Sequence, residues 1–357
     1  MRRLALLLLE VKCVRKSSAA AVLLFFSAVI SLLKIDPCGA DQYWISFARE
    51  GPPPSSTNFP PIGPECLMKI DGNGNILVRP HIVIPNTKFF VSANGASAIS
   101  HGQSGKLNFY TFSRKEDQCG SNSIYRAVID ARTLALDKFQ KTGICTGDVE
   151  NIQTTQREEK NFLSIDSLVN YEAHEVDSNG SLTGGKWVLA PSDQNGRGFG
   201  VSADGKVFFN TQTVSPPTGA NKTKLIAQHL DSDGRPRGKP VLIEYRRGFS
   251  AAMDISNVLP NNRRFAIFST VDNALNLDVI DGQTMQKIGR SIKLPKAFPV
   301  FQNAAIDPNG HFVVYFGFLK FPPSPLIYQS LDATGHPSGE PKVLAINIHG
   351  GIDILKD

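Results

Sequence analysis

The chain has 357 residues, of which 41% are hydrophobic, 20% charged and 9% aromatic, with 30 Gly and 23 Pro. This composition excludes an intrinsically disordered chain, collagen and a coiled coil, and the length permits a sizeable hydrophobic core. The net charge is +6, but residues 1–40 hold six Lys/Arg and only two acidic residues. The rest of the chain carries 32 basic and 30 acidic side chains, so it lacks the positive excess of a nucleic-acid-binding domain.

Residues 1–40 have the layout of a secretory signal. Arg15 and Lys16 precede an apolar run over residues 19–33, and a short polar stretch ends at Ala40. This order predicts export and cleavage after Ala40. A retained membrane anchor is the alternative, but the run is about 15 residues long and a transmembrane helix needs roughly 20. We therefore expect a periplasmic or secreted mature protein, residues 41–357, that forms one domain without a stable membrane span.

An internal repeat follows the leader. Six times, a short apolar or alternating stretch ends in an aspartate that is followed by a tight turn, at Asp71, Asp130, Asp177, Asp231, Asp281 and Asp332. The spacing averages about 52 residues, which is typical of repeat folds. Four copies have Gly three residues after the aspartate and two have Thr. Since Asp can accept backbone N–H groups two residues on and Gly tolerates positive φ, each copy predicts a β-hairpin.

A second series of small or apolar segments alternates with the first. It includes residues 98–100, 200–202, 252–254, 305–307 and 351–353, with 151–154 as a weaker member. Each unit of about 50 residues therefore contains four short strands, which we name a to d in chain order. Repeated aspartates in this series, Asp254, Asp307 and Asp353, are interpreted as turn-forming or capping residues.

Four-stranded units at this period predict an all-β fold, a six-bladed β-propeller. The first blade, residues 43–84, supplies strands b, c and d, and residues 351–357 supply its missing strand a. Pairing of the two ends closes the ring and removes an exposed edge. Seven blades and a β-sandwich pair are the alternatives.

Two of the repeats resemble those of exported bacterial propellers. Residues 128–134 (Val-Ile-Asp-Ala-Arg-Thr-Leu) and 279–285 (Val-Ile-Asp-Gly-Gln-Thr-Met) are similar to repeats of the TolB-like, YncE-like and lactonase-like groups. The resemblance implies fold and export. It carries no catalytic residue, because these groups include both scaffolds and enzymes.

The predicted blades have two unequal faces. The a–b and c–d turns, which are short, lie on one face, named here the hairpin face. The b–c and d–a loops lie on the other, the loop-rich face, and several contain proline clusters, such as the six prolines in residues 51–64. Proline lowers the entropy lost when a loop binds, so we predict that the loop-rich face binds the ligand.

Polar residues near the predicted start of strand a could join such a site. These candidate binding residues are Asp148, Glu150, Arg197, Arg246, Arg247, Gln302, Asn303 and His349. Three cysteines remain after cleavage, and Cys119–Cys145 is the preferred disulfide, with three free thiols as the alternative.

The favoured function is non-catalytic binding or scaffolding of a protein, peptide or envelope component by a monomer without a cofactor. The alternative is a metal-dependent lactonase or hydrolase, with a divalent cation held by carboxylates and amides on the propeller axis.

Overall fold

The computed structural model describes residues 41–357 apart from a set of connecting segments. The undescribed connections are residues 51–61, 86–96, 114–121, 147–148, 158–159, 168–169, 192–197, 215–221, 248–250, 270–273, 296–299 and 319–323. No helix in the described part is long and apolar enough to span a membrane.

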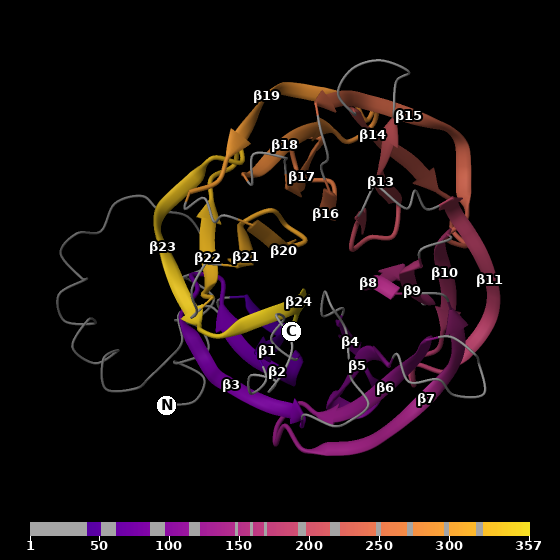
Figure 1. The fold of residues 1–357 in the computed structure, drawn as a ribbon, viewed down its shortest axis with the longest axis vertical. Coiled ribbons are helices and arrows are strands. Elements are labelled where there is room, and N and C mark those ends of the chain that lie inside the picture. Colours follow the sequence, from indigo (N-terminus) through magenta and orange to yellow (C-terminus); the bar gives the residue numbers. More distant parts are fainter. Residues whose placement is uncertain are drawn as a thin grey trace, which may run out of the picture. The chain divides into compact units, whose positions relative to one another are not determined.

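Six four-stranded antiparallel sheets surround a central axis, which confirms the six-bladed propeller (Figure 1). Blade 1 consists of β24 (Ile348–Lys356), β1 (Gln42–Glu50), β2 (Ile62–Asp71) and β3 (Ile76–Ile84). Blade 2 consists of β4 (Ala98–His101), β5 (Lys106–Ser113), β6 (Asn122–Asp130) and β7 (Leu136–Thr146), with the short 3₁₀ turn η1 (Gln103–Gly105). Blade 3 consists of β8 (Val149–Arg157), β9 (Lys160–Ser167), β10 (Asn170–Val176) and β11 (Leu182–Pro191).

The second half of the chain repeats this plan. Blade 4 consists of β12 (Phe199–Val201), β13 (Val207–Val214), β14 (Lys222–Leu230) and β15 (Pro236–Arg247). Blade 5 consists of β16 (Ala251–Ile255), β17 (Arg263–Ser269), β18 (Leu275–Asp281) and β19 (Lys287–Lys293). Blade 6 consists of β20 (Val300–Ile306), β21 (Phe312–Phe318), β22 (Leu326–Leu331) and β23 (Pro337–Ala345).

The ring closes as predicted, because β24 pairs antiparallel with β1. The ladder aligns Tyr43 with Lys356 and Ser46 with Asp353, and β24 starts three residues earlier than expected, at Ile348. The indole N–H of Trp44 also donates to the carboxylate of Asp357 over 3.0 Å. The last residues of the chain therefore stabilise the first sheet.

The repeated aspartates form the c–d hairpin turns in the predicted manner. In blade 1, Asp71 Oδ1 accepts the backbone N–H of Asn73 and of Asn75 at 2.9 and 2.8 Å, and Gly74 has a φ of 76°. In the two copies without Gly, positive φ falls on Leu134 (57°) and Met285 (59°), one residue after the Thr. Both of these side chains are buried, so packing fixes a conformation that glycine adopts freely elsewhere.

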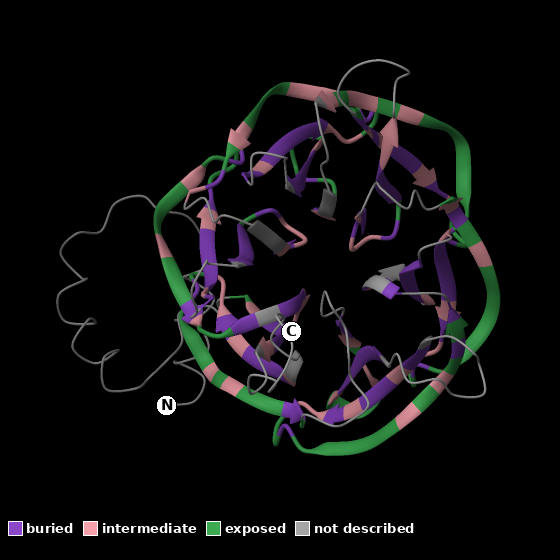
Figure 2. Cartoon of the chain, viewed as in Figure 1, coloured by how far each residue is buried: buried purple, intermediate pink, exposed green. Residues whose placement is uncertain are grey.

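The core lies between blades rather than at one centre. Inner and middle strands are buried, whereas outer strands are largely exposed (Figure 2). Phenylalanines of strands b and c pack there, for example Phe209 and Phe268, which stack at 5.4 Å across the interface of blades 4 and 5. Tyr43 and Trp44 of β1 are also buried.

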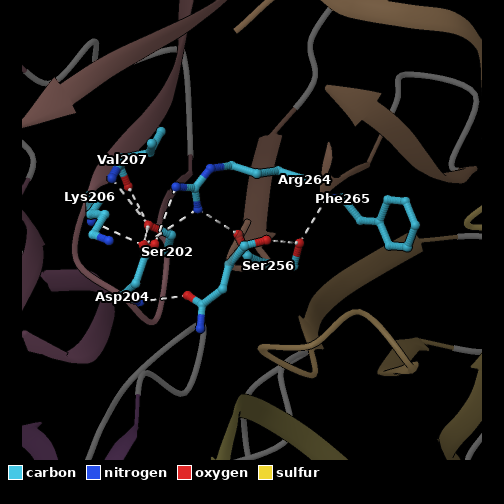
Figure 3. Close-up of polar contacts among 8 residues, drawn as sticks. Ser202, Asp204, Lys206, Val207, Ser256, Arg264 and Phe265 are labelled. Atoms are coloured by element: carbon cyan, nitrogen blue, oxygen red, sulfur yellow. Dashed lines mark hydrogen bonds and ion pairs between the residues drawn. The ribbon is translucent and has the colours of Figure 1, made fainter. Parts of the chain in front are cut away.

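A buried ion pair joins blades 4 and 5 near the hairpin face (Figure 3). Arg264 of β17 reaches the a–b turn of blade 4, where its Nη1 and Nη2 lie 3.4 and 3.3 Å from the two carboxylate oxygens of Asp204. The same Nη1 donates to the backbone carbonyl of Ser256 at 3.1 Å. Burial disfavours the charged Asp204, but the guanidinium of Arg264, the hydroxyl of Ser202 and the N–H of Lys206 together outweigh it and lower the pKa of this carboxyl. The pair links two blades through charge and hydrogen bonds.

Cys145 is disulfide-bonded and Cys66 is a buried free thiol. Cys119, the predicted partner of Cys145, lies outside the described residues, so this pairing stays a prediction.

Candidate axial site

The innermost strands of the six blades surround the axis (Figure 1). At one level, blades 1, 3 and 5 carry a polar side chain, Asp353, Gln153 and Asp254. Blades 2, 4 and 6 carry a small residue at the matching position, namely Ala98, Gly200 and Ala305. Polar and small residues therefore alternate around the ring.

Each polar side chain at this level binds the backbone of the next blade. The N–H of Ile99 donates to Asp353 Oδ2, that of Val201 to Gln153 Oε1 and that of Ile306 to Asp254 Oδ2, each at 2.8 Å. In each case the donating N–H belongs to the residue that directly follows the small residue of the axial level. These bonds join blade 1 to 2, blade 3 to 4 and blade 5 to 6.

Other contacts join two of the remaining neighbours. Thr154 Oγ1 donates to the carbonyl of Ile99 at 2.6 Å and so links blade 3 to blade 2. A Cβ at Gly200 would lie only 3.2 Å from the Cα of Asp254, so the small residue allows the inner strands of blades 4 and 5 to approach closely.

Both axial carboxyl groups have raised pKa values. Burial raises the pKa of Asp254 to about 7, against the effect of two backbone N–H groups. Burial also raises the pKa of Asp353, and the charge of Asp254 adds to this shift. The side chains are half-buried rather than sealed off. The two acids therefore influence each other's ionisation although blade 6 separates their blades.

The expectation for the repeated inner-strand aspartates was right for one residue and wrong for two. Asp307 forms its a–b turn, where its Oδ2 accepts the N–H of His311 at 3.1 Å. Asp254 and Asp353 are neither turn-forming nor capping residues, because they bridge blades. The backbone register explains the difference. Asp307 donates its N–H to the carbonyl of Phe312 in strand b, as Ser256 does to that of Phe265 in blade 5, and so lies two residues beyond the axial level.

Three predicted binding residues occupy irregular points of inner strands on the loop-rich side. Glu150 falls at the register shift between Val149 and Asn151, and Gln302 at the one between Phe301 and Asn303. His349 is the extra residue where β24 passes from Ile348 to Gly350 against β1. Such bulges bend a strand and re-aim its side chains, and they are frequent next to functional sites.

Of the remaining predicted binding residues, Asn303 and Arg247 lie in different blades. Asp148 and Arg197 lie outside the described residues. Asn303 pairs with Phe316 next to the bulge of β20, and Arg247 pairs with Lys222 at the end of the outer strand β15.

Arg246 takes part in a four-charge network between blades 4 and 5. It pairs with Glu244 and with Asp278, and its guanidinium lies 4.2 Å from the centre of the Phe268 ring. Lys287 contacts the same two acids, at 2.8 Å from Glu244 and 3.3 Å from Asp278. Because Asp278 is fully buried, this network stabilises the interface, and Arg246 contributes to it from a largely buried position.

The axial residues do not fit a divalent cation. Oδ1 of Asp353 accepts the N–H of Ile354, and Oδ1 of Asp254 accepts that of Ile255, at 2.9 and 2.7 Å. Together with the bonds between blades, all four carboxylate oxygens are already engaged by backbone donors. Within the described residues, no group of three His, Cys, Asp or Glu side chains could hold a metal ion.

The fold and its axial level place this chain among the six-bladed β-propellers. It matches no family model and no curated protein sequence. Among solved structures it is similar to a periplasmic gluconolactonase of Pseudomonas aeruginosa, with 13% identity, 88% of this chain and 99% of that chain covered, and a TM-score of 0.51. It is also similar to TolB of Acinetobacter baumannii, with 14% identity, 91% and 70% coverage, and a TM-score of 0.50. At these identities the similarity extends to the fold alone.

Proposed function

We propose that the protein is an exported, monomeric, non-catalytic recognition module that binds a protein, peptide or envelope component at its loop-rich face. The observation that carries the proposal is the use of the axial acids. All four of their carboxylate oxygens accept hydrogen bonds from backbone N–H groups, so these two side chains hold neighbouring blades together. We propose for ligand contact the residues at the inner-strand bulges, Glu150, Gln302 and His349.

The positions of the bulges support recognition at this face. They occur in β8, β20 and β24, so three different blades have an irregular segment on the same side. Residues 1–40, with their signal-like layout, support export to the periplasm or the medium.

Site-directed photocrosslinking in the producing cell tests the proposal. A photoreactive amino acid replaces Gln302 in one strain and Gln283, on an exposed c–d turn of the hairpin face, in the other. We expect a discrete crosslinked partner from position 302 and none from position 283. Crosslinks of equal yield at both positions, or none at position 302, would contradict binding at the loop-rich face.

A matched triple variant strengthens this test. Alanine at Glu150, Gln302 and His349 should abolish partner recovery with the tagged protein. Alanine at Glu340, Gln283 and Arg132 removes one acid, one amide and one base from exposed hairpin and outer-strand positions, and it should leave recovery unchanged.

The second candidate is a lactonase or hydrolase with a divalent cation at the loop-rich end of the axis. The fold similarity to a periplasmic gluconolactonase supports this candidate, because that protein is named as a lactonase. Elemental analysis of the purified protein and a lactone and ester panel separate the two functions. Stoichiometric metal together with turnover would show that the protein is an enzyme and would contradict the non-catalytic recognition module.

A further inference from the structure

A groove lies on the outer rim between blades 5 and 6, away from the loop-rich face. Its volume is about 550 Å³, within the range of small-molecule sites. Its walls come from strand β19 of blade 5 and from the c–d turn of blade 6, Thr334 to Pro337. This turn packs against blade 5, since a Cβ on Gly335 would lie 2.9 Å from the Leu277 side chain.

The groove combines an apolar floor with a basic rim. Val279, Ile288 and Ile292 provide apolar surface, and the two isoleucines pack onto the core between blades 5 and 6. Arg263, Arg290 and Lys293 add positive charge, and no acidic residue lines the groove. His336 stands at its edge, beside Asp332, whose carboxylate is engaged in its own turn.

The cations of this groove differ from the others on the same strand. Lys287, at the start of β19, is neutralised by Glu244 and Asp278 of the network between blades 4 and 5. Arg290 and Lys293, farther along β19, form no ion pair with any described residue, and neither does Arg263 of β17. The start of β19 is therefore balanced in charge, whereas its other end presents two positive charges without an ion pair among the described residues, above apolar side chains.

The exposed edge of β19 does not favour the binding of a partner as an additional β-strand. Between Leu277 and Val279 of β18 the register of β19 shifts from Ile292 to Ile288, so β19 contains a bulge, and Gly289 has a φ of 72°. A bulge and charged side chains on an edge strand oppose pairing with a further strand.

We propose that the rim groove binds a small amphipathic carboxylate, with the anionic head at Arg290 and Lys293 and the apolar chain on Val279, Ile288 and Ile292. Charge complementarity selects the head, because an anion balances these like charges. The buried apolar area supplies the affinity of the chain. The site is separate from the loop-rich face, so it stands whether or not the proposed function holds.

Titration calorimetry with octanoate tests the site on the purified mature chain. Octyl glucoside and octyltrimethylammonium serve as neutral and cationic probes with the same chain. We expect octanoate to bind, the other two not to bind, and the affinity for octanoate to fall as salt is added. Binding of all three probes with equal affinity would overturn the proposal.

Variants locate the site and reverse its selectivity. Arg290→Ala/Lys293→Ala should weaken octanoate binding at least tenfold, whereas the control Arg237→Ala/Lys239→Ala, on the exposed outer strand of blade 4, should not change it. Arg290→Glu/Lys293→Glu should abolish octanoate binding and create binding of octyltrimethylammonium. All four positions are exposed, and unchanged thermal melting will confirm folding. Equal weakening by the control pair, or binding of a Glu-Val-Glu-Val-Glu peptide in place of octanoate, would refute the small carboxylate.

Discussion

Arg264 and Arg126 are both buried between blades, but the contacts of their guanidinium groups differ. Arg264, between blades 4 and 5, has both carboxylate oxygens of Asp204 within 3.4 Å (Figure 3). Arg126 of β6, between blades 2 and 3, is 4% exposed, and its Nε and Nη1 have no hydrogen-bond partner. The sequence repeat therefore determines where neighbouring blades meet, but it does not determine how the charges at each interface are neutralised.

The neighbours of Arg126 show how this second interface is held instead. A Cβ on Gly180, in the c–d turn of blade 3, would lie 2.6 Å from Arg126 Cδ and 2.5 Å from the hydroxyl oxygen of Tyr110. The turn therefore lies directly on the arginine. Burial raises the pKa of Tyr110 to about 12 while the guanidinium acts in the opposite direction. Arg126 is therefore held between blades 2 and 3 by close packing, whereas Arg264 is held between blades 4 and 5 by an ion pair.

The largest expected effect comes from removing the partner of Arg264. Asp204→Ala leaves a buried guanidinium without its counter-charge, which costs about 3–5 kcal/mol at buried sites. Since the Asp204 side chain is 20% exposed, we expect the lower end, about 3 kcal/mol. Urea denaturation measures the free energy of unfolding. The double variant Asp204→Ala/Arg264→Met should recover most of the loss, and a loss below about 1 kcal/mol in the single variant would show that the pair is unimportant.

The second effect tests packing at the Arg126 interface. Gly180→Ala combines a positive φ of 71° with contacts under 3 Å, so we expect a loss of about 3 kcal/mol in unfolding free energy. Gly238→Ala is the matched control, because Gly238 has a φ of 73° and open space around the new methyl group. Backbone strain alone should cost about 1 kcal/mol there. Equal losses in both variants would mean that the turn does not press on Arg126.

The fold could be predicted because its determinants are local. An aspartate that accepts amides two and four residues on, together with glycine at positive φ, specifies a turn whatever the rest of the chain does. Six such turns at nearly constant spacing give the number of blades. The unpaired strand a at the C-terminus then predicts how the ring closes.

The axial level could not be predicted in the same way, because it depends on backbone donors in the next blade. Asp254, Asp307 and Asp353 recur at similar points of the repeat, although Asp307 lies two residues beyond the axial level. In blade 3 the axial position is held by Gln153, whose amide replaces the carboxylate, so a search for repeated aspartates does not find it. The alternation of polar and small residues was the available signal, but it appears only with the correct register.

The third effect concerns the Asp254 carboxyl, which is bound by backbone N–H groups instead of a cationic side chain. An Asp has a pKa of about 3.9 when unfolded, and that of Asp254 is about 7 in the folded chain. The folded state therefore binds more protons between these values, so the free energy of unfolding should fall as the pH rises from about 4 to about 7. Asp254→Asn should flatten this slope in urea denaturation at pH 5 and pH 8. A slope identical to that of the unsubstituted protein would refute the assignment.

The smallest effect is the most direct test of the comparison between the two arginines. Arg126 forms no ion pair with any described residue, so replacing it with an apolar side chain of similar length removes a desolvation penalty and strands no described partner. Arg126→Met should therefore change the free energy of unfolding by less than about 1 kcal/mol, or raise it. Arg264→Met, by contrast, strands Asp204 and should cost about 2 kcal/mol. If both variants lose the same stability by urea denaturation, Arg126 has a counter-charge that contributes as much as Asp204, and the two interfaces follow one rule.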